Sequence, residues 1–398
     1  MERLYLDPNL LIVFGVTLVA VMGVASLAPA FPLIGVVFGI PPETIGLLII
    51  VFTLPGAILT PIFGVLADRH GRKTILIPSL FLFGFAGFAC AFAREFIVLL
   101  ILRFFQGVGA ASLGALNVTI ISDLYSGKNR ADAMGYNASI TNIGVASYPA
   151  IGGTLAVLFG WYFPFFLPLL ALPIGIIVIV GLRNPEPDEE TKFSEYLHQA
   201  WKAIKNRQVS GVFISSLFTF VILYGAIINF LPYLPLFYGN AMLSGLVISC
   251  MSIAAALTAT QTGKLVNRYG ERTLLTLAFP LYALALFLII ILPTFWALYI
   301  PSIPIIWSVI ISVSIYGIAQ AINVPSLQML LARLALPEYR AALMSINGMV
   351  LRWGQTLGPL IMGIVVVLWD LQAVFLFSCF LALIMFPIII ATISPKAK

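Results

Sequence analysis

Short polar segments divide this chain into long apolar runs, and this division constrains the fold more than any other feature. The runs from Ile45 to Ala67 and from Thr74 to Ala93 are typical. About 20 apolar residues in a helix span the hydrocarbon core of a bilayer. Charged residues make up only 9% of the chain and hydrophobic residues 61%, whereas soluble domains carry about 25% charged residues. The chain is therefore predicted to be an all-α integral membrane protein.

The apolar runs predict twelve transmembrane helices, because 398 residues suffice for about twelve spans and short loops. The first run, Leu10 to Val37, is too long for the apolar core of a signal peptide and lacks a small-residue cleavage site, so we expect it to be the first span. The predicted helices cover residues 9–37, 44–67, 73–93, 96–122, 131–159, 162–182, 209–237, 242–264, 272–292, 296–331, 340–368 and 371–393.

The distribution of basic residues predicts the orientation. With the N-terminus in the cytoplasm, 18 of the 21 basic residues fall in cytoplasmic segments; only Arg94 falls outside, and Arg103 and Arg352 fall within helices. This asymmetry is the positive-inside pattern of a multi-pass plasma-membrane protein, here with both termini in the cytoplasm. The net charge of +6 therefore reflects orientation and does not indicate a nucleic-acid partner.

Cysteine and histidine usage predicts neither a metal site nor a cofactor. Cys90, Cys250 and Cys379 lie singly in apolar runs, where small packing roles are usual. His70 and His198 are far apart, with no cysteine pair or acidic cluster beside them. No pair of histidine, cysteine or acidic residues that could carry out catalysis lies near the middle of the membrane. We therefore expect no enzyme activity.

A charged segment interrupts the apolar pattern between Gly64 and Leu76 and is called the charged turn below. An arginine or aspartate at bilayer depth costs on the order of 3 kcal/mol, so this segment is expected at the membrane surface. Asp68 and Arg72 are four residues apart and can pair. Gly64 and Gly71 allow close helix approach and a sharp reversal.

The charged turn resembles, over its full length, the cytoplasmic loop signature of the major facilitator superfamily, G-x-L-A-D-R-x-G-R-K-x-x-L. A weaker copy begins 199 residues later at Gly263, with Asn267 in place of the aspartate and Glu271 in place of the first arginine. The resemblance implies a transporter in which this loop ties the two halves together while the outside is open. It implies a conformational latch made by Gly64, Asp68, Arg69, Gly71, Arg72 and Asp123, with Asp123 as the expected acceptor for Arg72. We expect a weaker latch from the second copy.

A second pair of segments supports a duplication. Residues 130–137 align with residues 340–347 at an offset of 210, which also pairs Gly144 with Gly354. Such a repeat predicts two pseudo-symmetric six-helix bundles. The predicted domains are residues 1–182 and 209–398, joined by a cytoplasmic linker at 183–208. Apolar residues between Leu197 and Ile204 recur with helical spacing, which predicts an amphipathic linker helix on the membrane surface.

Two further segments resemble motifs of the same superfamily. The run from Arg103 to Ala111 resembles R-x-x-Q-G-x-G-A, which implies a part for Arg103 in proton coupling; an arginine that snorkels to the outer surface is the alternative. The run from Gly144 to Gly153 resembles a motif of exporters that act as proton antiporters, with Tyr148 where glycine is usual. Simple close packing is the alternative. The expected helix-packing and kink residues are Gly144, Pro149, Gly153, Gly354, Gly358 and Pro359.

Proton antiport usually needs a titratable carboxylate at membrane depth, yet none of the fifteen acidic residues falls near the middle of a predicted span. Arginine stays protonated and cannot itself carry the proton. Arg103, Asp123 and Asp132 are the candidates for coupling, and uncoupled transport stays open.

Polar and aromatic residues at depth outline a predicted substrate cavity. A largely apolar pocket with a few polar groups suits amphiphilic ligands. Arg352 would favour an anionic group on the substrate, and hydrogen bonding to neighbouring helices is its alternative role. The predicted cavity residues, besides Arg352, are Asn117, Asn137, Asn142, Tyr224, Asn229, Tyr233, Tyr316, Gln320, Asn323 and Asn347.

Together these features predict a secondary active transporter that works as a monomer in the lipid bilayer by alternating access. The resemblance to the 12-helix drug/proton antiporter branch implies export of amphiphilic small molecules in exchange for protons. The alternative is a transporter of a specific anionic metabolite, lipid or siderophore, with or without proton coupling. A membrane enzyme lacks chemistry at depth, and a receptor lacks a further domain through which to signal.

Overall fold

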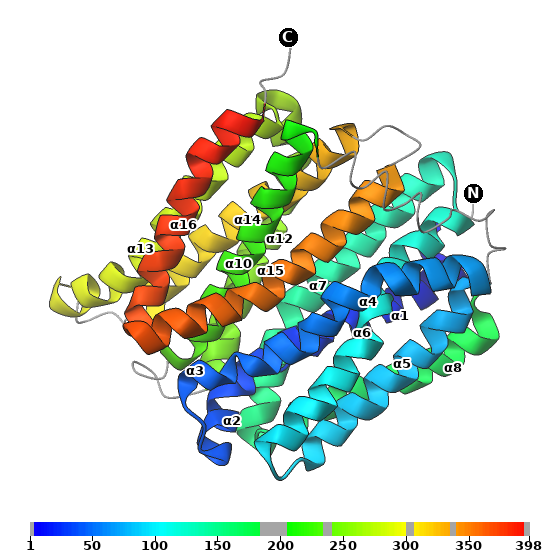
Figure 1. Ribbon diagram of the computed structural model, residues 1–398, viewed down its shortest axis with the longest axis horizontal. Coiled ribbons are helices and arrows are strands. Elements are labelled where there is room, and N and C mark those ends of the chain that lie inside the picture. Colours follow the sequence, from blue (N-terminus) through cyan, green and yellow to red (C-terminus); the bar gives the residue numbers. More distant parts are fainter. Residues whose placement is uncertain (1–3, 184–204, 234–240, 300–305, 335–339, 394–398) are drawn as a thin grey trace. The chain divides into compact units, whose positions relative to one another are not determined.

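The computed structural model is all-helical and describes residues 4–183, 205–233, 241–299, 306–334 and 340–393 (Figure 1). Twelve helical segments of this described part are long and apolar enough to cross a membrane, which confirms the predicted fold class. The helices are η1 (Leu4–Leu6), α1 (Pro8–Ala25), η2 (Ala28–Ala30), α2 (Phe31–Phe38), α3 (Pro42–Ile45), α4 (Leu47–His70), α5 (Arg72–Ala89), η3 (Cys90–Phe92), α6 (Phe96–Leu124), α7 (Gly127–Phe159), η4 (Phe163–Leu170), α8 (Ala171–Gly181), α10 (Arg207–Tyr233), α12 (Ala241–Tyr269), α13 (Glu271–Tyr299), α14 (Ile306–Leu334), α15 (Arg340–Leu368) and α16 (Leu371–Thr392).

Two predicted helix boundaries are wrong. Helix α13 continues to Tyr299, past Pro293, so the tenth predicted helix begins too early and α14 starts at Ile306. A proline inside a membrane helix need not end it, because neighbouring groups satisfy the freed carbonyl. The first span is interrupted at η2, where Pro29 sits. The predicted linker helix at Leu197–Ile204 and the side chain of Tyr233 lie outside the described residues.

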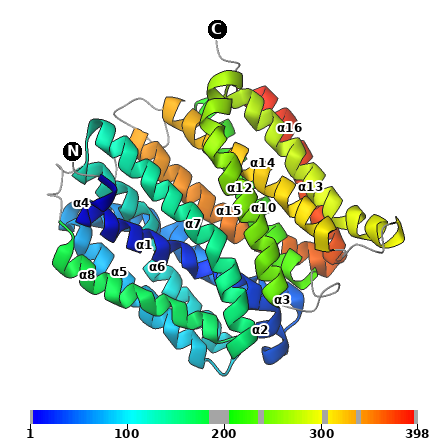
Figure 2. The ribbon, with the colours of Figure 1, turned by 180° about the vertical axis from the view of Figure 1, so that it is seen from behind.

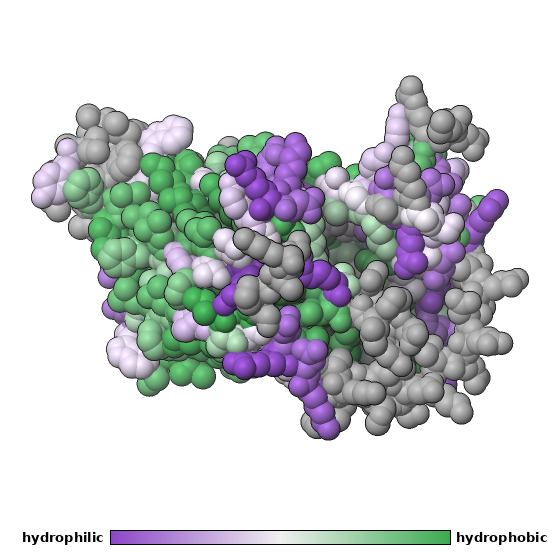
Figure 3. Space-filling view, turned by 90° about the horizontal axis from the view of Figure 1, so that it is seen from above, coloured by the Kyte–Doolittle hydropathy of each residue, from purple (hydrophilic) through white to green (hydrophobic). Residues whose placement is uncertain are grey.

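The chain forms two compact units. The first contains α1, α2 and α4 to α8; the second contains α3, α10, α12 from Leu246 onward, and α13 to α16. Figure 2 shows α1 and α7 of the first unit side by side. Val16, Leu80 and Leu113 are fully buried in the core of that unit. Large apolar side chains also cover much of the surface, as expected for helices that face lipid (Figure 3).

The same close helix contact occurs once in each unit. A Cβ added to Gly107 of α6 would overlap the backbone carbonyl of Phe52 on α4, and one added to Gly317 of α14 would overlap that of Met251 on α12. Gly107 and Gly317 are 210 residues apart, and their partners Phe52 and Met251 are 199 residues apart. These are the two offsets that relate the repeated segments of the sequence. Small residues let membrane helices approach this closely. The duplication therefore extends to individual backbone contacts.

A threonine reinforces this contact in each unit. Thr60 of α4 donates a hydrogen bond to the carbonyl of Ala111 on α6 at 2.8 Å, and Thr262 of α12 donates one to the carbonyl of Ala321 on α14 at 2.9 Å. Both hydroxyls are buried. Lipid is as apolar as the helix surfaces, so the hydrophobic effect does not hold membrane helices together. Hydrogen bonds between helices therefore add to van der Waals packing in stabilising the bundle.

The predicted packing glycines behave differently in the two units. In the second unit, Cβ atoms at Gly354 and Gly358 of α15 would lie 2.7 and 2.6 Å from backbone carbonyls of α10, so both glycines are required there. In the first unit, a Cβ added to Gly152 of α7 would overlap the backbone carbonyl of Ser26, the residue that follows α1. The ring of Tyr148 occupies the space beside Gly144. A tyrosine at this position prevents the tight contact that Gly358 makes.

Substitution of either duplicated glycine tests these contacts. We expect Gly107→Ala and Gly317→Ala each to lower the free energy of unfolding by about 1–3 kcal/mol, because the added methyl group forces the backbones apart. Denaturant or thermal unfolding in detergent measures this loss. Gly135→Ala in α7 is the matched control, since no described atom lies within 4 Å of its Cβ position, and it should not destabilise. Equal stability of Gly107→Ala and Gly135→Ala would contradict the contact.

Candidate functional site

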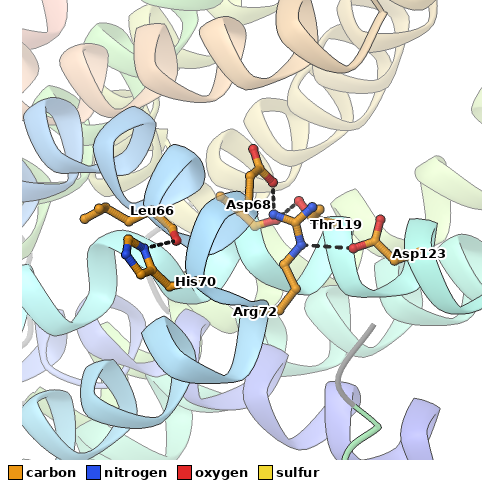
Figure 4. Close-up of polar contacts among 7 residues, drawn as sticks. Leu66, Asp68, His70, Arg72, Thr119 and Asp123 are labelled. Carbon is orange, nitrogen blue, oxygen red and sulfur yellow. Dashed lines mark hydrogen bonds and ion pairs between the residues drawn. The ribbon is translucent and has the colours of Figure 1, made fainter. Parts of the chain in front are cut away.

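The charged turn holds a buried arginine between two carboxylates (Figure 4). Arg72 Nε lies 2.9 Å from Asp123 Oδ2 on α6, and Arg72 Nη1 pairs with Asp68 on α4. The Arg72 side chain is 11% exposed. Gly71 begins α5 with φ 90°, a conformation that favours glycine and makes the sharp reversal. The expected contact of Arg72 with Asp123 is therefore present, and three helices are joined through one guanidinium group.

The other residues of the turn have separate surroundings. No described atom lies within 4 Å of a Cβ placed on Gly64, so the close approach expected there is not present in the described chain. Arg69 is exposed. Lys73 Nζ donates to the carbonyls of Ile179 and Leu182, at 2.8 and 3.0 Å, at the end of α8. Cations favour helix C-termini, but sequence alone did not indicate which helix end Lys73 would reach.

The weaker second copy makes an ion pair of opposite polarity. Glu271 Oε2 lies 3.1 Å from Arg333 Nη1, at the positions equivalent to Arg72 and Asp123. Gly270 makes the reversal with φ 80°, and Arg272 donates to the carbonyl of Ile390 near the end of α16, as Lys73 does in α8. The second turn thus keeps the geometry of the first, with one ion pair instead of two among the residues that the structure describes.

Arg103 is fully buried inside the first unit, which excludes the snorkelling alternative. Its guanidinium donates to the carbonyls of Gly23 and Leu48, at 3.0 and 3.3 Å, and to Gln106 Oε1 at 2.7 Å. It also lies 4.2 Å from the ring centroid of Phe52, a favourable cation–π position. The contacts join α1, α4 and α6. Asp132, in contrast, is exposed near the start of α7.

Two predicted cavity residues of the first unit form a hydrogen-bonded network. Asn117 Nδ2 donates to Thr17 Oγ1 at 2.9 Å, and Thr17 Oγ1 lies 2.6 Å from Asn137 Oδ1. All three residues are buried, although Asn117 Oδ1 has no partner in the described chain. The network joins α1, α6 and α7. Thr17 was missed, because a single threonine in an apolar run gives no sequence signal.

The predicted cavity residues of the second unit lie in several places. Gln355 Nε2 donates to Tyr224 Oη at 3.2 Å, and Arg352 lies one turn away on the same face of α15. Asn229 bonds within its own helix, to the carbonyl of Gly225. Gln320 is half-buried and Asn323 fully buried.

Tyr316 lines an apolar pocket of the second unit with residues that include Phe230, Met251 and Phe375. Its ring packs against Tyr282 at 4.8 Å between centroids.

Twelve membrane helices, a duplicated set of contacts and charged turns at helix ends define a membrane transporter built from two repeats. The family model described as the Major Facilitator Superfamily matches residues 13–313 and 238–398. The chain belongs to this superfamily: it is a secondary membrane transporter and not an enzyme.

Named relatives and solved structures agree with this class. The chain is 28% identical over 239 residues to the bacillibactin exporter of Bacillus subtilis (strain 168), a match that covers 58% of each chain. It is 29% identical over 184 residues to the quinolone resistance protein NorA of Staphylococcus aureus, with 44% of this chain and 47% of NorA covered. A mutant form of the nucleoside transporter NupG superposes with a TM-score of 0.80 at 15% identity, over 97% of this chain and 100% of NupG.

A charge exchange tests the ion pairs of the two turns. We expect Arg72→Glu to destabilise the protein by about 2 kcal/mol or more, since it places three carboxylates together with little water. Combining it with Asp68→Asn and Asp123→Arg recreates the arrangement of Glu271 and Arg333 and should restore most of the loss. Thermal unfolding in detergent measures both. A triple variant as unstable as the single one would show that the two turns are not equivalent.

Proposed function

We propose that the protein exports amphiphilic small molecules from the cytoplasm in exchange for protons, by alternating access. The observation that carries this proposal is Arg72 held between Asp68 and Asp123 in a charged turn that matches the superfamily signature completely. Relatives named an exporter and a drug-resistance protein support the direction of transport. We propose further that the protein is a monomer in the plasma membrane, with both termini and the charged turn on the cytoplasmic side, as the positive-inside pattern favours.

In this proposal the charged turn is a conformational latch. Arg72 joins the ends of α4, α5 and α6, all in the first unit, so its two ion pairs break only when these helix ends move relative to one another. A network with two discrete arrangements is the kind of element that biases a two-state equilibrium. Asp123 is the preferred carrier of the coupling proton: its protonation removes one charge from the pair and weakens the latch.

In this proposal Arg103 holds neighbouring helices in position. It stays protonated, and its bonds to Gly23 and Leu48 fix α1 and α4 against α6. The buried positive charge therefore orients the helices and does not itself move a proton.

Proton movement in proteoliposomes tests the function. With a pH gradient and ethidium as the probe, we expect ethidium-dependent proton flux in the wild-type protein. Asp123→Asn should reduce it about tenfold or more, because its latch no longer responds to protonation. Glu95→Gln is the matched control, since Glu95 is exposed at the other end of α6 and its side chain does not cap the helix. Equal proton flux in Asp123→Asn and the wild-type protein would contradict the assignment of Asp123.

A second candidate function is transport of a specific anionic metabolite or siderophore. The match to a bacillibactin exporter and the partly buried positive charge of Arg352 on α15 favour it. Arg352 lies beside Tyr224 and Gln355, which could orient an acidic group.

Charge-selective loss distinguishes the two functions. If Arg352 binds an anionic group, Arg352→Gln should weaken binding of anionic compounds about tenfold, or about 1.4 kcal/mol, and leave neutral compounds unchanged. Thermal-shift titration with matched anionic and neutral compounds measures the difference. Equal losses for both would assign Arg352 to helix packing.

A further inference from the structure

The network of Thr17, Asn117 and Asn137 has an altered counterpart in the second unit. The offset of 199 residues places Ser216 of α10 where α1 has Thr17. The offset of 210 places Asn347 of α15 where α7 has Asn137, and Leu327 of α14 where α6 has Asn117. Two of the three polar residues are thus kept, and the third is replaced by leucine.

A pocket lies at this place in the second unit. Its lining residues come from α10, α14 and α15: Ser216, Phe220, Val324, Leu327, Gln328, Asn347 and Leu351. All three counterpart residues are among them. The first unit fills the equivalent place with the Asn117 amide, which donates to Thr17 at 2.9 Å. Leucine at 327 can donate no such bond.

The polar atoms left beside Leu327 have no protein partner in the described chain. Ser216 and Asn347 are 1% and 3% exposed, and neither Ser216 Oγ nor Asn347 Oδ1 is hydrogen-bonded there. Asn323, one turn from Leu327 on α14, is 0% exposed, with both amide atoms also unpartnered. Buried polar groups without partners are rare in folded proteins, because each costs about 1–3 kcal/mol. Their clustering indicates that a guest supplies the missing bonds.

The size and charge of the pocket limit this guest. The space open to the centre of a water molecule is about 10 Å³, close to the minimum that one water requires. No lining residue is charged, and burial of an unpaired ion in such surroundings is strongly unfavourable. The guest is therefore small and uncharged, with both a donor and an acceptor.

We propose that the pocket of α10, α14 and α15 binds one small uncharged hydrogen-bonding group in place of the Asn117 amide. The group donates to Asn347 Oδ1 and accepts from the Ser216 hydroxyl. It is a water molecule or the hydroxyl or amide of a bound cargo molecule, which offer the same chemistry. The site is independent of the cargo class and direction proposed above, since its evidence lies within the second unit.

Restoring the asparagine of the first unit tests the proposal. We expect Leu327→Asn to raise the Tm of the full-length protein in detergent by about 2–4 °C, because its amide replaces the guest. In a background that carries both Ser216→Ala and Asn347→Leu the new amide has no acceptor, so Leu327→Asn should lower the Tm instead. The matched control in the first unit, Asn117→Leu, should lower the Tm by a similar amount.

Radiolytic hydroxyl-radical footprinting without any cargo distinguishes the sources of the guest. If the guest is water, Phe220 and Leu351 are labelled in the wild-type protein and protected in Leu327→Asn. If they are unlabelled while the Tm effect of Leu327→Asn changes sign between the two backgrounds, the guest is a group of the cargo. Both results support the site.

The result that overturns the proposal is a Tm effect of Leu327→Asn with the same sign in both backgrounds. General misfolding of Leu327→Asn lowers the Tm in both backgrounds, so a rise in the wild-type background excludes misfolding as the cause of the sign change. The outcome does not depend on proton flux, so failure of the transport proposal leaves this test unaffected.

Discussion

In hydrocarbon, a buried polar group without a hydrogen-bond partner is strongly unfavourable, and this cost governs the structure. Thr60 and Thr262 satisfy carbonyls across helix pairs. Lys73 binds carbonyls at the end of α8. Arg103, which is fully buried, is surrounded by carbonyls, an amide and a ring. Apart from the bond of Arg103 to Gln106 within α6, each of these bonds joins different helices, so the polar groups also determine which helices are neighbours.

The two units keep the same contacts while their chemistry differs. The ion pair of Arg72 with Asp123 reappears as Glu271 with Arg333, with the charges exchanged. Where Gly152 packs against Ser26 in the first unit, Gly225 packs against Met362 in the second, and a Cβ added to Gly225 would lie 2.5 Å from Met362 Cγ. The exchange keeps one ion pair at the turn and one glycine at the helix contact, so a duplicated bundle can diverge without losing either contact.

Sequence reasoning predicted contacts where charge left few options. Arg72 needed an acid at the same membrane surface, and Asp123 was available at the end of the fourth helix, so the pair could be foreseen. The partners of Lys73 are backbone carbonyls, which every helix end offers, so that contact could not. Asn117 and Asn137 were predicted to line the substrate cavity, yet they bond to Thr17 within the first unit. A polar residue at depth either faces a cavity or satisfies a neighbour, and its type does not distinguish these roles.

The sequence by itself determined the twelve spans, the duplication and the charged turns, because hydropathy and residue spacing depend only on order along the chain. Only the tertiary structure decided how each helix is rotated about its axis, and hence which polar groups meet. That rotation follows from close backbone contacts such as those of Gly107 and Gly358, whose partners lie far away in the chain. The unpartnered amides beside Leu327 result from the same packing: a network that three helices complete in the first unit is left open in the second, where one side chain is apolar.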